Sequence, residues 1–281
     1  MKEFMKRALI LSGGGARGAF QVGVWNYLQE IGWDPDLICG TSVGALNAVA
    51  IGSGMPLEKL MHIWKTLNRG EAYRWQLLRF FWSALFARTY RPLMDTGPLR
   101  NTITNAVDLE ALRRSPRDIL ITTVNIRTNR INLYDQNTIE VDHVMASSAL
   151  PGFFPWQTID GQPHWDGGVM ANTPLFPALE QGAAEIIVVL LSPVGQFDQP
   201  EPRGVHDVAE LAFEQLLIGS CQATLHEYNP AWSGIERPRI SVVAPTRMLG
   251  FRSLLNFSVK QALQLIDEGY QGAKEQLAGV V

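Results

Sequence analysis

Cysteine and histidine are scarce in this sequence, and neither shows a spacing that binds metal. Cys39 and Cys221 are the two cysteines among 281 residues. They are too few for a disulfide framework or for a zinc site with paired ligands. The five histidines are scattered, with no His-x-x-x-His pair. We therefore expect neither a metal nor a cofactor, and the sequence leaves the role of Cys39 open.

Long apolar runs and blocks of like charge are also missing. No stretch of about 18 apolar residues occurs, so no segment is expected to span a membrane. The charged Met1–Arg7 and the short apolar Ala8–Leu11 do not form a signal peptide, which points to the cytoplasm. The formal net charge is −3, without a clustered basic face. Nucleic acid is therefore not an expected partner.

What the sequence does contain is the pattern of a packed α/β protein. Arg7–Ser12 is a short apolar run typical of a buried strand, and Ala19–Ile31 has apolar residues at helical spacing. Leu37–Cys39 and Ser42–Ile51 repeat this order, and such strand–helix units build parallel sheets. No linker divides the chain. We expect one domain over residues 1–281, a three-layer α/β/α sandwich with a mainly parallel sheet.

The remaining elements follow from the same patterns. Further strands are predicted at Ile119–Ile126, Ile131–Tyr134, Glu185–Leu191 and Arg239–Val243. Asp160-Gly161 is a strong two-residue turn signal, which predicts a hairpin between Gln157–Ile159 and Pro163–Trp165. Helices are predicted at Val141–Ser148, Leu175–Gln181, Val205–Leu225 and Ser258–Leu277.

A possible nucleophile lies between the second strand and the second helix. Gly40-Thr41-Ser42-Val43-Gly44 fits G-x-S-x-G. A sharp strand-to-helix turn crowds its neighbours, so glycine is needed two residues before and after a nucleophilic serine. The helix dipole favours negative charge at Ser42. The pattern predicts a nucleophile, and the alternative is a Ser42 that only caps the helix.

A glycine-rich loop, Gly13–Gly18, follows the first strand and contains G-x-G-x-x-G. Dinucleotide binding would need an acidic residue at the end of the second strand, where Thr41 and Ser42 stand instead. The alternative is an oxyanion hole, because a turn without side chains lets backbone N–H groups face a developing charge. The loop and Ser42 are then expected side by side. Arg17 either anchors the loop, meets an anionic head group or lies at the surface.

Two kinds of base fit Ser42. A conventional triad runs serine, acid, histidine along the chain, and Asp166 followed by His206 or His226 satisfies that order. Both histidines fall in or beside a predicted helix, where a surface position is favoured. Asp166-Gly167-Gly168 instead ends a predicted strand, and two glycines permit a close backbone approach. An aspartate within hydrogen-bond reach can take the serine proton directly. His164 is left without a role.

These elements, in this order, resemble the patatin-like phospholipase family, in its compact bacterial form. The resemblance rests on four segments: GGGARG at Gly13–Gly18, GTSVG at Gly40–Gly44, DGG at Asp166–Gly168, and Met145–Trp156 before the aspartate. The resemblance implies an α/β/α sandwich that hydrolyses acyl esters of lipids without a metal. It implies a Ser42–Asp166 dyad without histidine. It also implies an oxyanion loop at Gly13, Gly14 and Gly15, supported by Arg17 and Gly18.

One residue departs from the family pattern, and three functions are compared. Ser12 stands where many members carry aspartate before the glycines. The first function is a lipid acyl-hydrolase acting through an acyl-enzyme on Ser42. The second is a triad esterase using His206 or His226, and the third is a non-catalytic lipid-binding module. The intact Ser42, Asp166 and glycine loop favour an enzyme.

Tyr73–Arg91 is the most unusual segment outside the motifs. It combines aromatic residues with arginines and has no acidic residue. Arginine beside tryptophan and phenylalanine suits a membrane interface, where rings lie at head-group depth. We expect a peripheral membrane contact or a lid here; the alternative is a helix packed on the core with its arginines reaching water. The segment's arginines are Arg74, Arg79, Arg88 and Arg91.

Overall fold

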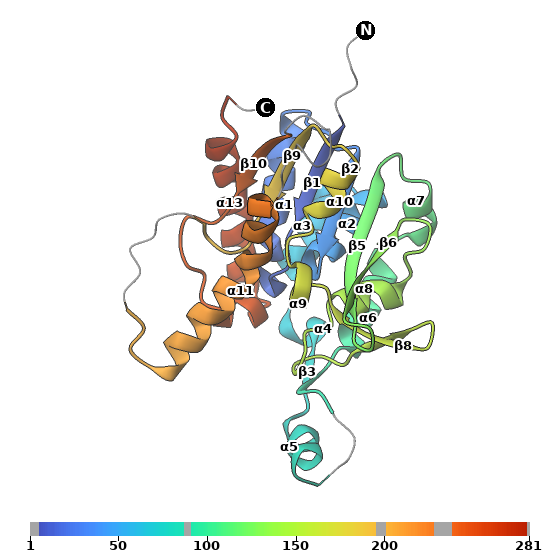
Figure 1. Ribbon diagram of the computed structural model, residues 1–281, viewed down its shortest axis with the longest axis vertical. Helices are drawn as coiled ribbons and strands as arrows, with labels where there is room; N and C mark the ends of the chain where they lie inside the picture. The colour runs from blue at the N-terminus through green and yellow to red at the C-terminus, as the bar shows by residue number, and fades with distance from the viewer. Residues whose placement is uncertain (1–5, 87–90, 195–200, 228–237, 280–281) are drawn as a thin grey trace.

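A central sheet of eight strands organises the protein in the computed structural model, which describes residues 6–86, 91–194, 201–227 and 238–279 (Figure 1). Five neighbouring strands are parallel, in the order β10-β9-β1-β2-β5. Strands β8, β7 and β6 continue the sheet beyond β5 with antiparallel pairing. The predicted α/β class with a mainly parallel sheet is confirmed. The bounds are β1 Arg7–Leu11, β2 Leu37–Thr41, β5 Asp118–Asn125, β6 Arg130–Asp135, β7 Gln157–Ile159, β8 Gln162–Asp166, β9 Glu185–Val189 and β10 Arg239–Val243.

Helices cover both faces of this sheet, because successive strand side chains point to opposite sides. Leu9 and Leu11 of β1 belong to a core with α1 (Ala19–Glu30), α2 (Val43–Gly52), α3 (Leu57–Thr66) and α13 (Val259–Gln276). Ala8 and Ile10 belong to a second core with α10 (Phe176–Glu180) and α11 (Val205–Glu227). Parallel strands buried on both faces therefore read as continuous apolar runs.

The first and last long helices cross closely at two glycines. A Cβ added to Gly23 of α1 would lie 1.9 Å from the Ile266 carbonyl oxygen of α13. A Cβ added to Gly269 of α13 would lie 2.1 Å from the Phe20 carbonyl oxygen of α1. Larger residues would force the two backbones apart. The C-terminal helix is thus part of the layer that supports the glycine-rich loop.

The region between α2 and β5 has weak sequence patterns and contains several short elements. In Figure 1, α5 lies apart from the main body, beyond the two-stranded sheet of β3 and β4. No helix in the described part of the chain has the length and apolar character that a membrane crossing requires. The bounds are α4 Arg69–Ala72, β3 Arg74–Trp75, α5 Leu77–Phe86, β4 Met94–Asp95, α6 Gly97–Ala106 and α7 Leu109–Arg113.

Every strand and helix predicted from the sequence is present, with ends that differ by at most two residues. The hairpin at Asp160-Gly161 is confirmed, because Gln157 pairs with His164 and Ile159 with Gln162. Short elements complete the site edge of the sheet. These are η1 Gly15–Gly18, α8 Val141–Ser147, α9 Gly168–Ala171 and η2 Phe251–Leu255.

Candidate active site

Ser42 occupies a strained turn between β2 and α2. Its backbone has φ 55° and ψ −123°, a positive φ that is costly for a residue with a side chain. A Cβ on Gly40 would lie 2.3 Å from the Gly44 carbonyl oxygen, and one on Gly44 would lie 2.1 Å from the Leu11 carbonyl oxygen. A side chain at either position would clash with neighbouring backbone atoms, so both positions require glycine. The turn has the shape that a nucleophile elbow needs.

Neighbouring residues hold this turn in place. The Ser42 amide donates to Ser147 Oγ at 2.9 Å, so that amide is already satisfied. The hydroxyl of Thr41 lies 2.6 Å from Thr122 Oγ1 and donates to the Ala171 carbonyl oxygen at 2.8 Å. Both threonines are fully buried. The strain at Ser42 is thus stabilised by hydrogen bonds from α8, β5 and α9.

Asp166 ends β8 beside Ser42 and is almost fully buried, with 3% of its surface exposed. Its Oδ1 accepts from the Gly168 amide at 2.7 Å, and the Ser42 side chain lies near enough to help lower the pKa of its carboxyl group. Burial raises the pKa of Asp166 from 3.8 to about 7, while the Gly168 amide and the Ser42 side chain oppose that rise. A buried carboxyl with a pKa near neutrality is suited to exchanging a proton with a serine.

The two glycines after Asp166 leave room for neighbouring groups. A Cβ on Gly167 would lie 2.2 Å from Thr122 Oγ1. A Cβ on Gly168 would lie 2.9 Å from Asn172 Oδ1 and 3.0 Å from Asp166 Oδ1. The DGG sequence therefore places the carboxylate tightly against its own following turn. Side chains at either glycine would displace Asp166 from Ser42.

Among the described side chains, no histidine is hydrogen-bonded to Ser42 or Asp166. His164 is buried on β8, with Nδ1 2.9 Å from Thr123 Oγ1 and Nε2 3.3 Å from Asn125 Nδ2. Burial lowers its pKa, and the ring is held by residues of the neighbouring strand β5. His206 and His226 lie in α11, and their side chains are outside the described residues.

The glycine-rich loop lies beside Ser42, but one of its amides is occupied. The Gly13 amide donates to the Asn172 carbonyl oxygen at 2.9 Å, which corrects the expectation that Gly13 belongs to the oxyanion donors. Among the described residues, the amides of Gly14 and Gly15 have no such partner, and both glycines line the cavity that holds Ser42 and Asp166. Gly15 has φ +57°, and the Leu254 carbonyl oxygen lies 2.2 Å from its Cβ position.

Arg17 is fully buried under this loop, which excludes both a surface position and contact with a lipid head group. Its Nη1 donates to the Leu191 carbonyl oxygen at 3.1 Å and to Glu214 Oε2 at 3.0 Å. Nε donates to Ser253 Oγ at 2.7 Å, and Nη2 reaches the Gly250 carbonyl oxygen and Glu214. A single side chain thus joins the loop to α11 and η2. Gly18 beside it is packed against Val43 and Trp64.

The start of the loop is held through the main chain of Ser12. Its amide donates to the Val189 carbonyl oxygen at 3.1 Å, and its carbonyl oxygen accepts from Gln21 Nε2 at 2.7 Å. The Ser12 hydroxyl is buried and has no partner in the described structure. The departure from aspartate at this position therefore leaves the loop attached by its backbone.

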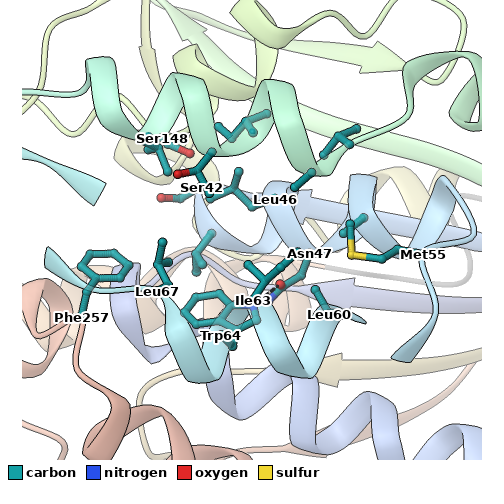
Figure 2. A pocket seen from close by; sticks show the side chains of 18 of the residues that line it. Ser42, Leu46, Asn47, Met55, Leu60, Ile63, Trp64, Leu67, Ser148 and Phe257 are labelled. Carbon is teal, nitrogen blue, oxygen red and sulfur yellow. Dashed lines mark hydrogen bonds between the residues drawn. The ribbon is translucent and has the colours of Figure 1, made fainter. Parts of the chain in front are cut away.

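Two cavities meet at Ser42 (Figure 2). The first, which we call the Leu46 cavity, has a volume of about 100 Å³ and runs along α2 toward Met55 and Leu60. The second, the Asp166 cavity, has a volume of about 340 Å³. No histidine, lysine or arginine is found among the described residues that line either one. The Leu46 cavity is mainly apolar, with Ile63, Trp64, Leu67, Leu99 and Ile103 in its wall.

Some residues of the site were missed by the motifs. Ser147 and Ser148 fall in Met145–Trp156, which resembled the family but suggested no individual role. Asn172 lies outside the motifs, yet its main chain and side chain both contact Gly13. Glu214 lies mid-helix, and no local pattern marks it as the partner of Arg17. Such residues are specified by the tertiary structure.

Cysteine and acidic residues do not gather into a metal site in the described ranges, where no group of three or more potential ligands occurs. Cys39 is buried in the middle of β2, and burial raises its thiol pKa far above the ordinary value. A thiol in that state is neutral and packs as a small apolar side chain.

Comparison with known proteins agrees with this geometry. The patatin-like phospholipase family model matches residues 9–179, so the chain belongs to that family. A cGAMP-activated phospholipase of Vibrio cholerae is 29% identical, over 89% of this chain and 76% of that protein. A cGAMP-activated phospholipase of Escherichia coli is 28% identical, over 62% of this chain and 54% of that protein, about half its length.

The fold is also found in a solved structure of low sequence identity. VipD from Legionella pneumophila aligns with a TM-score of 0.54 at 14% identity, over 98% of this chain and 67% of that one. At this identity the likeness concerns the fold alone. Family and relatives together make the chain a lipid ester hydrolase.

Proposed function

We propose that the protein cleaves carboxylic esters of lipids with Ser42 as nucleophile and Asp166 as its base. The observation that carries this proposal is that Ser42 and the buried Asp166 line the same cavity, with no described histidine in its walls, and that Ser42 helps to lower the pKa of Asp166. Serine needs an adjacent base to attack a carbonyl carbon. Here the adjacent base is a carboxylate.

The reaction follows from this pair. Ser42 Oγ bonds to the acyl carbon as its proton passes to Asp166, and the carbonyl electrons move to oxygen. The amides of Gly14 and Gly15 stabilise this oxyanion, with the N-terminus of α2 beside them. The intermediate collapses, the alkoxy oxygen leaves with the proton from Asp166, and an acyl-enzyme remains on Ser42. Water then repeats the sequence and releases the acid.

The cavity walls support a lipid acyl chain as the group transferred. Leu46 and Ala50 of α2 line the Leu46 cavity at one-turn intervals from Ser42, and Met55 follows beyond the helix. At about 1.5 Å per residue, the stretch of helix from Ser42 to Ala50 spans about 12 Å, roughly the length of ten methylene groups. An acyl chain lying along α2 would bury its apolar surface there.

A serine-directed fluorophosphonate tests the nucleophile. We expect labelling of the natural protein at Ser42 and none of Ser42→Ala, while His206→Ala and His226→Ala label and hydrolyse normally. Loss of about 10³-fold in either histidine variant would favour the triad esterase instead. Labelling without turnover of any ester would favour the lipid-binding module. EDTA should leave the rate unchanged, because the proposed chemistry uses no metal.

We also propose that α5 docks on a lipid surface. Leu78 is 82% exposed and Trp82 67% exposed, and Phe81 and Phe86 are exposed on the same helix. Arg74, Arg79 and Arg91 are exposed around it, whereas Arg88 and Tyr90 lie outside the described residues. Rings and guanidinium groups together suit the head-group layer of an anionic membrane. The protein would then act as a cytoplasmic enzyme with peripheral contact at the membrane.

A further inference from the structure

Ser148 lies at the junction of the two cavities and has an unused hydroxyl. It lines both the Leu46 cavity and the Asp166 cavity, as Ser42 does. Figure 2 shows Ser148 beside Ser42 at the same end of the Leu46 cavity, opposite Met55 and Leu60. The residue is 7% exposed, and its Oγ has no partner in the described structure.

The main chain of Ser148 is hydrogen-bonded within the protein, but its hydroxyl group does not contribute to the described structure in this way. Ser148 follows α8, and its amide donates to the Val144 and Met145 carbonyl oxygens at 3.2 Å each. Its neighbour Ser147 differs, since that hydroxyl accepts from the Ser42 amide. A buried hydroxyl without a partner costs about 1–3 kcal/mol of stability. A group kept at that cost inside a reaction site calls for an explanation, and a hydrogen bond made only to bound substrate would supply one.

Other unpartnered polar atoms provide a comparison. Ser12 Oγ, Trp165 Nε1 and Thr173 Oγ1 are also buried without a partner in the described structure. None of those three residues lines either cavity at Ser42. Ser148 is therefore distinguished by its position. Thr173, 2% exposed, is the matched case of a buried hydroxyl away from the cavities.

We propose that Ser148 Oγ donates a hydrogen bond to the alkoxy oxygen of the scissile ester. This inference rests on the proposed reaction at Ser42. With the acyl chain in the Leu46 cavity and the alcohol portion in the Asp166 cavity, the ester crosses the junction where Ser42 and Ser148 stand. The carbonyl oxygen faces the Gly14 and Gly15 amides. The alkoxy oxygen is then the remaining acceptor, and Ser148 is the free donor beside it.

The hydrogen bond assists one step without transferring a proton. When the tetrahedral intermediate collapses, the bond between carbon and alkoxy oxygen breaks, and its electron pair moves to that oxygen. Asp166 supplies the proton that neutralises it. Ser148 stays protonated throughout and stabilises the charge that develops before this transfer is complete. The contact therefore matters most for alcohols that leave poorly.

Two esters of one acid test this contact in Ser148→Ala. Glyceryl monobutyrate has an alkyl leaving group, whereas p-nitrophenyl butyrate releases a phenolate that needs little assistance. A hydrogen bond made at the transition state predicts that kcat/KM for the glyceryl ester falls about 10- to 100-fold. For the p-nitrophenyl ester we expect a fall of less than about threefold. Ser148→Cys, which keeps the volume with a weak donor, should show the same selectivity and replaces the alanine variant if that does not fold.

Thr173→Val is the matched control. Both Ser148→Ala and Thr173→Val remove a buried hydroxyl without a partner, so neither should lower the melting temperature. Only Ser148→Ala should change the ratio of the two rates. Equal losses on both esters, an unchanged glyceryl rate, or the same selectivity in Thr173→Val would each overturn the proposal. Failure of the Ser42 mechanism is distinguishable, because Ser42→Ala would then keep activity on both esters.

Discussion

The Ser42 site and α5 are both rich in large apolar side chains, yet they present them differently. Around Ser42 these side chains turn inward and enclose two cavities. On α5 they turn outward, and Leu78 and Trp82 are among the most exposed apolar residues of the described chain. In the proposed function, the first region would remove a lipid chain from water, and the second would offer a surface to an aggregate of lipids.

The two regions are also held in different ways. Ser42 is fixed by backbone contacts at Gly40 and Gly44 that leave no room for a Cβ. The segment before α5 is joined to the rest by the two-residue pairing of β3 with β4. Chemistry needs atoms fixed to within a fraction of an ångström, whereas docking on a fluid surface does not. Of the two regions, the backbone is therefore more tightly packed around Ser42, where the proposed reaction would take place.

The largest effect is expected from Asp166→Asn at the rigid site. Asparagine fits the same space but cannot accept the Ser42 proton, so we expect kcat to fall by about 10³-fold or more on any ester. Turnover of p-nitrophenyl butyrate measures this. Retention of roughly a tenth of the activity would show that another group is the base.

The same variant should be more stable than the natural protein at alkaline pH. Burial raises the folded-state pKa of Asp166 to about 7, so the native state favours the protonated carboxyl. Its stabilising effect is complete below about pH 4 and is lost as pH rises through about 7, by up to about 4 kcal/mol. Replacing the carboxyl group with an amide in Asp166→Asn removes this loss. Urea unfolding at about pH 4 and about pH 8 should show most of the gain at the higher pH.

Arg17→Met should give the next largest effect, on stability. It leaves Glu214 buried without its cation, which costs about 3–5 kcal/mol. Arg17→Met with Glu214→Leu should recover much of this, because no buried charge remains. Arg79→Met on α5 is the matched control and should change stability by less than about 0.5 kcal/mol. Urea midpoints compare all three, and equal losses in Arg17→Met and Arg79→Met would contradict the contrast between the regions.

The change of the hydrolysis rate with pH should be smaller than these mutational effects, and its direction follows from the pKa of Asp166. Asp166 must be ionised to act as base, so kcat/KM should rise with pH through about 7 and level off above it. Between about pH 6 and about pH 8 the expected rise is about tenfold. A profile that is flat over this range would mean that the carboxylate is not the titrating base.

The smallest effect is expected at α5 and should depend on the form of the substrate. Replacing Phe81, Trp82 and Phe86 with serine should reduce hydrolysis of anionic vesicles roughly fivefold and leave p-nitrophenyl butyrate unchanged. The matched variant replaces exposed Val205, Val259 and Leu263 with serine and should change neither rate. If the α5 variant loses both activities equally or unfolds, α5 belongs to the core and the docking proposal is wrong.

The sequence predicts those strands, helices and turns that are determined by neighbouring residues. The apolar runs of β1 and β9 predicted buried strands, and Asp160-Gly161 predicted its hairpin, because periodicity and turn chemistry act over a few residues. The short elements between α2 and β5 carry weaker patterns and were largely left unassigned. Glu214 contacts Arg17, 197 positions away, and Asn172 contacts Gly13, 159 positions away. Contacts between residues so far apart in the sequence leave no local pattern that could predict them.

The burial of Arg17 has a consequence for how much chain a working enzyme needs. The family match ends at residue 179, whereas the described hydrogen-bond partners of the Arg17 guanidinium lie between Leu191 and Ser253. The part of the chain that matches the family model is therefore shorter than the part that Arg17 holds together. A fragment cut at the family boundary would keep Ser42 and Asp166 but would lose the described partners of Arg17 and, with them, residues that bury it. Exchange of the family-matching part between relatives should therefore succeed only when α11, which carries Glu214, is exchanged together with the loop that carries Arg17.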